Sequence, residues 1–342
     1  RISNDSVLLS SFGHKAKEIF SKIKQVQIVA CGTSYNAGLV AKYWFEDIAK
    51  IPCNVEVASE YRYRRPILLN DTLFITLSQS GETADTVEAL RASKKINSNT
   101  SSLCITNSSE SSLTRLSDLT FLTHAGPEIG VASTKAFTTQ LVALALLICS
   151  IGSLKKSINK KQEKEIINGL KRLPGLVNEA LLQETQIKNL AIRFKDKNSA
   201  LFLGRGTMHA IAMEGALKLK EISYIHAEAY PAGELKHGPI ALIDQDMPVI
   251  AIAPNDELLV KLKSNLHEVK SRGSQMIVFE DKNSKIKAMD SMEVIPITSN
   301  LGRITAPIIF TIPLQLLSYH VALEKGTNVD KPRNLAKSVT VE

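Results

Sequence analysis

Long, uninterrupted apolar segments are missing from this sequence of 342 residues. The stretch 141–151 is too short to span a bilayer, and the stretch 307–323 is interrupted by Pro313 and by polar residues such as His320. We interpret both stretches as buried helices, and we expect no association with a membrane.

Cysteine is also scarce, and no two cysteines form a C-x-x-C motif. The four cysteines lie far apart in mostly apolar settings: Cys31, Cys53, Cys104 and Cys149. This pattern indicates reduced thiols in the core of a cytoplasmic protein. A signal peptide is absent as well, and the sequence begins at Arg1 instead of Met, so we expect a fragment or a trimmed chain.

Signatures of nucleic-acid binding are absent, although the formal net charge is +8. The lysines are spread along the chain, and no zinc-finger, homeodomain or RNA-binding motif accompanies them. We therefore expect no nucleic-acid partner, and instead a solvated basic surface that also attracts small anions. The content of 44% hydrophobic and 22% charged residues is ordinary for a soluble globular protein, and the length suits two domains of roughly 150–170 residues.

The most informative pattern is a predicted strand, a polar loop and a predicted helix in succession. Residues 72–77 are β-branched and apolar, as in a buried strand, and apolar residues from Ala84 onward recur at helical spacing. The loop between them, 78–83 (S-Q-S-G-E-T), combines hydroxyl groups with a glycine. Because a helix start presents unpaired N–H groups and a positive dipole end, this loop predicts a phosphate site. The alternative is that Ser80 or Thr83 merely caps the helix.

Strands and helices are expected to alternate along the first half of the chain. A helical lead-in at 3–24 and a helix at 36–50 accompany predicted strands at 26–30, 53–58, 72–77, 102–106 and 119–123. This alternation predicts an α/β fold in which a doubly wound, mostly parallel sheet is flanked by helices in a three-layer α/β/α arrangement. A polar, lysine-rich segment at 152–164 is expected to mark the boundary before a connecting helix.

The second half of the chain repeats the first. The predicted strand 200–203 leads into G-R-G-T, just as the strand 26–30 leads into C-G-T-S. Two further matches join H-A-E-A-Y at 226–230 to A-S-E-Y at 58–61, and 246–253 to 71–78. We conclude that the chain is a tandem duplication.

The two copies differ where the phosphate loop is expected. At the position of 78–81 the second copy carries A-P-N-D, residues 253–256. Pro254 lacks an N–H donor, and Asp256 repels an anion. A plain helix cap would give the copies less reason to differ, so we expect one phosphate site, in the first half.

Three further segments are candidates for chemistry. Glu221 follows Lys218 near the end of a predicted helix and could move a carbon-bound proton, or it could form an ordinary surface ion pair. His237 lies in a loop framed by glycine and proline, which suits proton transfer near neutral pH, although loop histidines are commonly just solvated. Lys337 lies in a tail after the last predicted helix and could form a Schiff base if partly desolvated, although tail lysines are usually solvated.

Six motifs are jointly specific: C-G-T-S at 31–34, S-Q-S-G-E-T at 78–83, E-I-G-V-A-S-T-K at 128–135, K-L-K-E-I-S-Y at 218–224, G-E-L-K-H-G-P at 233–239 and P-R-N-L-A-K-S-V-T-V-E at 332–342. With them, essentially the whole chain resembles the isomerase half of glutamine–fructose-6-phosphate aminotransferase, also called glucosamine-6-phosphate synthase. The fold of this family is two sugar isomerase (SIS) domains in tandem, which agrees with the duplication. The domains expected are a first SIS domain with its lead-in at 1–155, a connecting helical segment at 156–190, a second SIS domain at 191–325 and a catalytic tail at 326–342.

The resemblance also implies roles for individual residues. Lys337 would form a Schiff base with fructose 6-phosphate, and Glu221 would move a proton between C1 and C2, with Lys218 close by. His237 of a neighbouring subunit would open the sugar ring. The substrate-binding residues implied are Thr33, Ser34, Ser78, Gln79, Ser80, Thr83, Val131, Ser133 and Ala336. No metal or organic cofactor is expected, because the lysine serves as the electron sink.

The resemblance further implies partners. The expected ligands are fructose 6-phosphate, glucose 6-phosphate and glucosamine 6-phosphate, and a homodimer is expected because His237 would serve a neighbouring site. The N-terminal glutaminase half of the family, which supplies ammonia, is missing from this sequence, so we expect no glutaminase activity. Two other functions stay open: a phosphosugar-sensing SIS module, and a sugar deglycase or plain phosphosugar isomerase.

Overall fold

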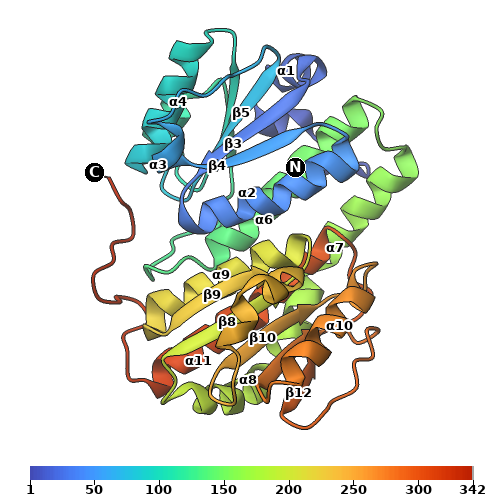
Figure 1. The fold of residues 1–342 in the computed structure, drawn as a ribbon. Helices are drawn as coiled ribbons and strands as arrows, with labels where there is room; N and C mark the ends of the chain where they lie inside the picture. Colours follow the sequence, from blue (N-terminus) through green and yellow to red (C-terminus); the bar gives the residue numbers. More distant parts are fainter. Residues whose placement is uncertain (341–342) are drawn as a thin grey trace. The chain divides into compact units, whose positions relative to one another are not determined.

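The computed structural model describes residues 1–340, which fold into two compact units (Figure 1). Unit 1 contains Arg1–Ile129, Ser133–Leu170 and the segment from Ala336 onward, and unit 2 contains Gly130–Ala132 and Lys171–Leu335. Val341 and Glu342, which belong to the expected tail 326–342, lie outside the described residues. The units divide at Leu170 and Leu335, and the expected domain limits at residues 155, 190 and 325 stay a prediction.

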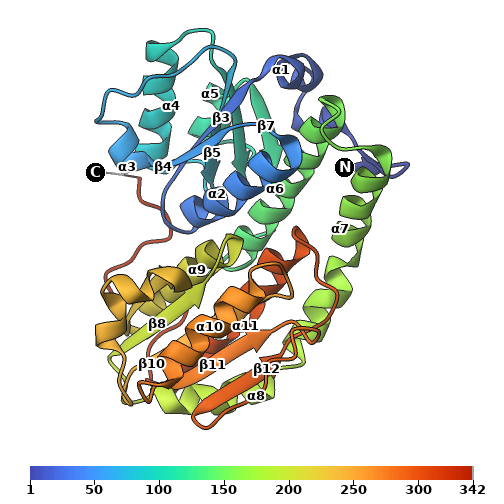
Figure 2. The same cartoon turned by 45° about the vertical axis from the view of Figure 1, so that its right-hand side comes forward.

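Unit 1 is built on a five-stranded parallel sheet. Neighbouring strands follow the order β4 (Cys53–Val57), β3 (Gln25–Ala30), β5 (Thr72–Ser78), β6 (Ser101–Thr106) and β7 (Leu119–Leu122). One face of the sheet carries α3 (Ala58–Tyr61) and α4 (Ala84–Ile96), and the other carries α2 (Gly32–Trp44) and α6 (Lys135–Leu154) (Figure 1 and Figure 2). All residues of the central strand β5 are buried, as helices on both faces require.

Shorter elements complete unit 1. They are β1 (Ile2–Ser3), β2 (Ser6–Val7), the 3₁₀ turn η1 (Leu9–Phe12), α1 (Ala16–Lys22), the π-helical turn η2 (Phe45–Ala49) and α5 (Ser112–Leu116). Helix α7 (Lys160–Leu181) begins in unit 1 and continues into unit 2.

Unit 2 has a second five-stranded parallel sheet, in the order β9 (His226–Pro231), β8 (Ser199–Gly204), β10 (Pro248–Ala253), β11 (Gln275–Glu280) and β12 (Met292–Pro296). Three helices pack together on one face: α8 (Glu184–Ala191), α9 (Thr207–Ser223) and α11 (Thr305–Glu324). On the other face the apolar side chains of α10 (Leu259–Lys270) join those of β8, β10 and β11 in one core. Short 3₁₀ turns are η3 (Ile192–Phe194), η4 (Ala232–His237) and η5 (Pro239–Leu242).

The two sheets have the same strand order, which confirms the predicted fold class and the tandem duplication. In each five-stranded sheet, the strand that comes first in the chain has the second strand on one side and the remaining three on the other side. The direction in which strands are added to the sheet thus reverses between β3 and β5 in unit 1, and between β8 and β10 in unit 2. In sheets of this kind, ligands bind at the carboxyl ends of the two strands that flank the reversal.

The structure corrects three local expectations. The predicted helical lead-in 3–24 begins as a β-hairpin, because Asn4 and Asp5 both have positive φ, 49° and 57°, and form the tight turn between β1 and β2. The helix predicted from Asn36 begins earlier, at Gly32, whose φ of 52° allows the sharp entry from β3. The boundary segment predicted at 152–164 is shorter, since α6 and α7 occupy both of its ends.

Two helices, α6 and α11, are long and apolar enough to cross a membrane by length and composition. Buried residues make up 72% of the apolar window of α6 and 78% of that of α11. Both helices therefore have the character of core helices, as the interpretation of the stretches 141–151 and 307–323 predicted.

Candidate active site

The candidate site in unit 1 lies at the reversal point of the sheet. The C-G-T-S segment directly follows β3, and the S-Q-S-G-E-T loop follows β5 and precedes α4. Because β3 and β5 are parallel neighbours, their carboxyl ends bring the two polar segments to the same edge of the sheet. The fold therefore positions the predicted phosphate loop where ligands bind in such sheets.

Internal hydrogen bonds shape the 78–83 loop. The Ser78 hydroxyl oxygen accepts the N–H of Gly81 at 3.0 Å and lies 3.0 Å from the hydroxyl of Thr83. The Ser80 hydroxyl oxygen accepts the N–H of Glu82 at 3.2 Å. Gly81 has a φ of +70°, and a Cβ at this position would lie 2.2 Å from the hydroxyl oxygen of Ser111. Only glycine fits this turn, so the backbone of the loop is tightly determined.

The helix-capping alternative for this loop is wrong. Thr83 occupies the N-cap of α4, and no side chain forms a capping hydrogen bond there. The N–H of Ala84 instead donates to the backbone carbonyl of Val339, at 3.1 Å. The hydroxyls of the loop thus do not serve as caps of α4, and the tail of the chain contacts the start of this helix.

Glu82 anchors the loop to its surroundings. Its carboxylate accepts the N–H and the hydroxyl of Ser112, both at 2.7 Å. These hydrogen bonds, the hydroxyl first, lower the pKa of Glu82. An ionised Glu82 therefore fixes the loop from outside while the serine and threonine side chains remain near the start of α4.

The segment after β3 contributes two predicted ligands. The Ser34 hydroxyl oxygen is buried and accepts the side-chain N–H of Gln140 at 3.0 Å. Thr33 is half-buried in the first turn of α2, where no side chain caps the helix. In the 78–83 loop, Gln79 is half-buried, and its backbone carbonyl accepts the N–H of Asn107 at 3.0 Å.

The C-terminal tail brings Lys337 to this side of unit 1. The hydroxyl of Ser338 lies 3.1 Å from that of Ser80, although 258 residues separate them in sequence. The Nζ of Lys337 lies 2.5 Å from Oε2 of Glu128, whose side chain is almost completely buried. Lys337 is therefore a partly desolvated lysine beside the loop, and the alternative of a freely solvated tail lysine is wrong.

Unit 2 holds a separate cluster of buried charges on α9. The Nζ of Lys218 lies 2.6 Å from the carboxylate of Glu221 and 3.3 Å from that of Glu214. Lys218 is 2% exposed and Glu214 is 1% exposed. Burial opposes the charge of Lys218, but Glu214 and Glu221 outweigh it and raise the pKa of the amine. The predicted pair of Lys218 and Glu221 is thus a buried ionic cluster, and the surface ion-pair alternative is wrong.

The tail also contacts the end of α9 within unit 2. The backbone N–H of Arg333 donates to the Tyr224 hydroxyl at 2.9 Å, and the Arg333 guanidinium stacks 4.2 Å above the Tyr224 ring. The N–H of Val131 donates to the carbonyl of Asp330 at 3.0 Å. His237 ends η4 and is exposed.

Comparisons with known proteins agree with this architecture. The SIS domain family matches residues 19–150 and 193–325, more than half of the chain. The glutamine–fructose-6-phosphate aminotransferase (isomerizing) of Pseudomonas aeruginosa is 58% identical over all 342 residues, and that of Escherichia coli is 57% identical. The chain spans 56% of the length of each of these relatives.

The C-terminal domain of glucosamine-fructose-6-phosphate aminotransferase from Francisella tularensis is a similar solved structure. Its TM-score is 0.94 at 54% identity, and the match covers 96% of this chain and 92% of that one. The chain belongs to this aminotransferase family. A glucosamine-6-phosphate deaminase from Thermotoga maritima is more distant, with a TM-score of 0.71 and 25% identity. The aminotransferase resemblance drawn from the six motifs is therefore confirmed.

The predicted site residues of this aminotransferase domain divide between the two units. Unit 1 holds Thr33, Ser34, Ser78, Gln79, Ser80, Thr83, Ser133, Ala336 and Lys337, and unit 2 holds Val131, Lys218, Glu221 and His237. The roles of these residues stay a prediction. Within residues 1–340, no group of three or more His, Cys, Asp or Glu side chains is arranged to hold a metal ion.

Two acidic residues that contact predicted site residues of the aminotransferase domain were not predicted from the sequence. Glu214 precedes Lys218 by one helical turn, so its spacing was a usable signal. Glu128 stands 209 residues before its partner Lys337, and no local pattern joins them. Its signals are its place at the head of the E-I-G-V-A-S-T-K motif and its position shortly before the start of a long helix.

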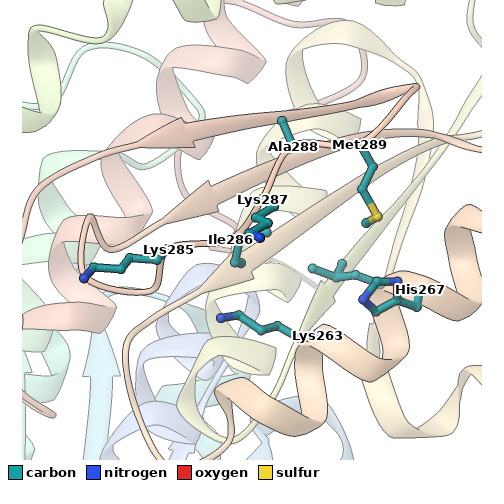
Figure 3. Close-up of a pocket in the computed structure, with 8 residues that line it drawn as sticks. Lys263, His267, Lys285, Ile286, Lys287, Ala288 and Met289 are labelled. Carbon is teal, nitrogen blue, oxygen red and sulfur yellow. The ribbon is translucent and has the colours of Figure 1, made fainter.

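A cavity of about 470 Å³ lies elsewhere in unit 2, between α10 and the segment that precedes β12 (Figure 3). Its lining includes Lys263, Leu266, His267 and residues 285–289. Figure 3 shows Lys285 extending away from His267 and Met289. None of the predicted site residues lines this cavity, so it is not part of the candidate site of the aminotransferase domain.

Proposed function

We propose that this chain is the sugar-isomerase part of a glutamine–fructose-6-phosphate aminotransferase. In this role it binds fructose 6-phosphate and converts it to the glucose or glucosamine 6-phosphate skeleton. The observation that carries the proposal is the contact of the Lys337 segment with the phosphate loop, through Ser338 and Ser80 at 3.1 Å. A partly desolvated lysine next to an anion-binding loop supports imine chemistry on a bound phosphosugar.

The phosphate binds first in this proposal. The hydroxyls of the 78–83 loop and the Gln79 side chain hold its oxygens, helped by Thr33 and Ser34. The positive end of the α4 dipole adds to this attraction. Val131, Ser133 and Ala336 line the sugar.

The sugar is then opened and converted. His237 from a neighbouring subunit opens the sugar ring, and the Lys337 amine then adds to the C2 carbonyl to form a Schiff base. The protonated imine makes the C1 protons more acidic, and ammonia can replace Lys337 at C2. Glu221 moves a proton between C1 and C2, and the Nζ of Lys218, 2.6 Å away, keeps this carboxylate oriented.

The surroundings of the enzyme are part of the proposal. A homodimer is required if His237 acts on a neighbouring site. Ammonia comes from a glutaminase domain, as the name of the relatives suggests, and a cytoplasmic location suits the unpaired, mostly buried cysteines.

One alternative has a specific observation in its favour. The likeness to a glucosamine-6-phosphate deaminase, at 25% identity and a TM-score of 0.71, supports a deglycase that releases ammonia from an amino sugar. The two functions differ in preferred direction. Comparing the rates of ammonia incorporation into fructose 6-phosphate and ammonia release from glucosamine 6-phosphate distinguishes them.

Trapping of the imine tests the main proposal. Purified protein is mixed with fructose 6-phosphate and borohydride, and the adduct is mapped by mass spectrometry. We expect the adduct on Lys337, and Lys337→Ala should abolish isomerisation of hexose 6-phosphates while inorganic phosphate still binds. Lys331→Ala is the matched control, because this exposed tail lysine should leave turnover unchanged. Unchanged turnover in Lys337→Ala would exclude the Schiff base, and a chain that binds phosphosugar without any turnover would be a sensing module.

A further inference from the structure

Glu128 links the candidate nucleophile to a fixed helix start. Its Oε1 accepts the backbone N–H groups of Thr134, at 2.8 Å, and Ala136, at 3.1 Å, where α6 begins. Its Oε2 lies 2.5 Å from the Nζ of Lys337. The start of α6 therefore fixes the orientation of the carboxylate, while the second oxygen is directed at the amine.

Glu128 is ionised in the resting protein although its side chain is buried. The side chain of Glu128 is 4% exposed, and that of Lys337 is 27% exposed. Burial alone would raise the pKa of Glu128, but hydrogen bonds from Lys337 and from the N–H groups of Thr134 and Ala136 outweigh it and hold the pKa below its usual value. Lys337 thus faces an ionised carboxylate.

Imine formation by a protonated lysine requires that two protons leave Nζ. An ammonium has no lone pair, so one proton must leave Nζ before nitrogen attacks the C2 carbonyl. Over the whole step, two N–H bonds and the C2–oxygen double bond break, and a C2–nitrogen double bond and two O–H bonds form. A ketone and an ammonium give a protonated imine and water, so charge is conserved and no further reactant is needed.

We propose that Glu128 is the proton carrier of this step. Its Oε2 accepts a proton from Nζ, passes it to the oxygen on C2 after attack, and then repeats the transfer so that this oxygen leaves as water. Glu128 ends as the carboxylate that pairs with the protonated imine. The inference rests on the proposed Schiff-base function of Lys337, and it assigns to Glu128 a step separate from the C1-to-C2 proton transfer of Glu221.

Glu128→Gln isolates the chemistry from the structural role of Glu128. The amide oxygen of glutamine can still accept the N–H groups at the start of α6, but the side chain cannot carry a proton. Glu163→Gln is the matched control in the same unit. Glu163 is likewise buried, and its carboxylate contacts the Nζ of Lys160 at 2.8 Å and the hydroxyl of Ser153 at 2.9 Å.

The experiment measures the rate at which the imine forms. Each protein is mixed rapidly with fructose 6-phosphate, quenched with borohydride at increasing times, and the mass of the Lys337 peptide is followed. We expect Glu128→Gln to form the adduct about 100-fold more slowly than the wild type, the usual size of a general acid–base contribution. Glu163→Gln should match the wild type, Glu128→Asp should recover part of the rate, and affinity for inorganic phosphate should be unchanged in all of them.

Two results would overturn the inference. One is a wild-type rate of adduct formation in Glu128→Gln. The other is equal loss of rate in Glu128→Asp and Glu128→Gln together with weakened phosphate binding, which would indicate a structural role. A wild-type protein that gives no adduct on Lys337 would instead contradict the proposed function itself, and the wild-type reaction therefore separates the two failures.

Discussion

The two units share one sheet order, but the loops at the reversal points differ in chemistry. In unit 1 the loop after β5 has three hydroxyls, and Gly81 makes the turn that fits against Ser111. In unit 2 the loop after β10 has Pro254 and Asp256, and the Asp256 carboxylate accepts the N–H of Leu258 within its own turn. The same strand order thus carries a loop rich in hydroxyl groups in unit 1 and a loop with a carboxylate in unit 2, and only the first suits the proposed phosphate site.

The helix that follows the first strand of each five-stranded sheet shows the reverse asymmetry. The buried residues of α2 include no charged side chain, whereas α9 buries Glu214 and Lys218. Unit 1 therefore has the anion loop without a buried ionic cluster on this helix, and unit 2 has the cluster without the loop. Under the proposed function, one copy binds phosphate and the other holds a carboxylate for proton transfer.

Replacement of Lys218 should have the largest effect on the free energy of unfolding. It tests whether α9 differs from α2 by a buried ionic cluster. Lys218→Met leaves Glu214 and Glu221 without their shared cation, and an uncompensated buried charge typically costs about 3–5 kcal/mol. Lys220→Met on the same helix is the control, because Lys220 is exposed and should change stability little. Urea unfolding measures both. Equal stability of the two variants would mean that the cluster is not a buried ionic unit, and Lys218→Met should also lose isomerisation.

Two glycines with similar backbone conformations test how tightly the 78–83 loop is packed. Gly81 in unit 1 and Gly326 in unit 2 have nearly equal φ, +70° and +68°, but only Gly81 has a neighbour in the space of a Cβ. Gly326→Ala should cost about 1 kcal/mol from φ alone, and Gly81→Ala, with the added clash against Ser111, about 3 kcal/mol. Calorimetry of inorganic phosphate binding should show a large loss of affinity in Gly81→Ala alone. Retained affinity would argue against this loop as the phosphate site.

Acidification should change the contributions of Glu82 and Asp256 to the free energy of unfolding in opposite directions. We expect this effect to be the smallest of those predicted here. The Ser112 hydrogen bonds lower the pKa of Glu82, so its stabilisation is full above about pH 4.3, the value for unfolded glutamate, and is lost as pH falls through the folded-state pKa. Burial raises the pKa of Asp256, so its contribution is full below about pH 3.9 and is lost as pH rises through the folded-state pKa.

Two neutral variants test this opposition. Glu82→Gln should flatten the loss of unfolding free energy on acidification, and Asp256→Asn should raise the unfolding free energy at neutral pH. Urea unfolding across the acidic to neutral range measures both. The same pH dependence in both variants would mean that the two loops do not differ in the sign of their electrostatics.

The fold was predictable because its signals are local. Apolar runs such as 72–77 become buried strands, and the repeat of the strand pattern predicted two equal sheets. The predictions were wrong where a few residues override periodicity. Asn4 and Asp5 turn the chain with positive φ, which replaces the start of the expected helical lead-in by a hairpin. Gly32 starts α2 four residues early, since a glycine at positive φ is compatible with the sharp turn out of β3.

The site was only partly predictable, because some of its contacts are not local. The 78–83 loop carries its own signal, a polar, glycine-containing turn between a strand and a helix. The pairing of Lys337 with Glu128 joins residues 209 positions apart, and neither residue carries a local signal for the other. The pairing of Glu214 with Lys218, four positions apart on α9, could have been found from helical spacing.

The contacts between the tail and the rest of unit 1 can form only late in the synthesis of the chain. The ribosome makes the Ser80 loop 258 residues before Ser338, and all of Lys171–Leu335 is made in between. Unit 1 can build its sheet early, but its contacts with Lys337 and Val339 form only after unit 2 has emerged. Under the proposed function, Lys337 is therefore the last part of the site to be made, and a nascent chain that already has the 78–83 loop cannot yet form the proposed imine.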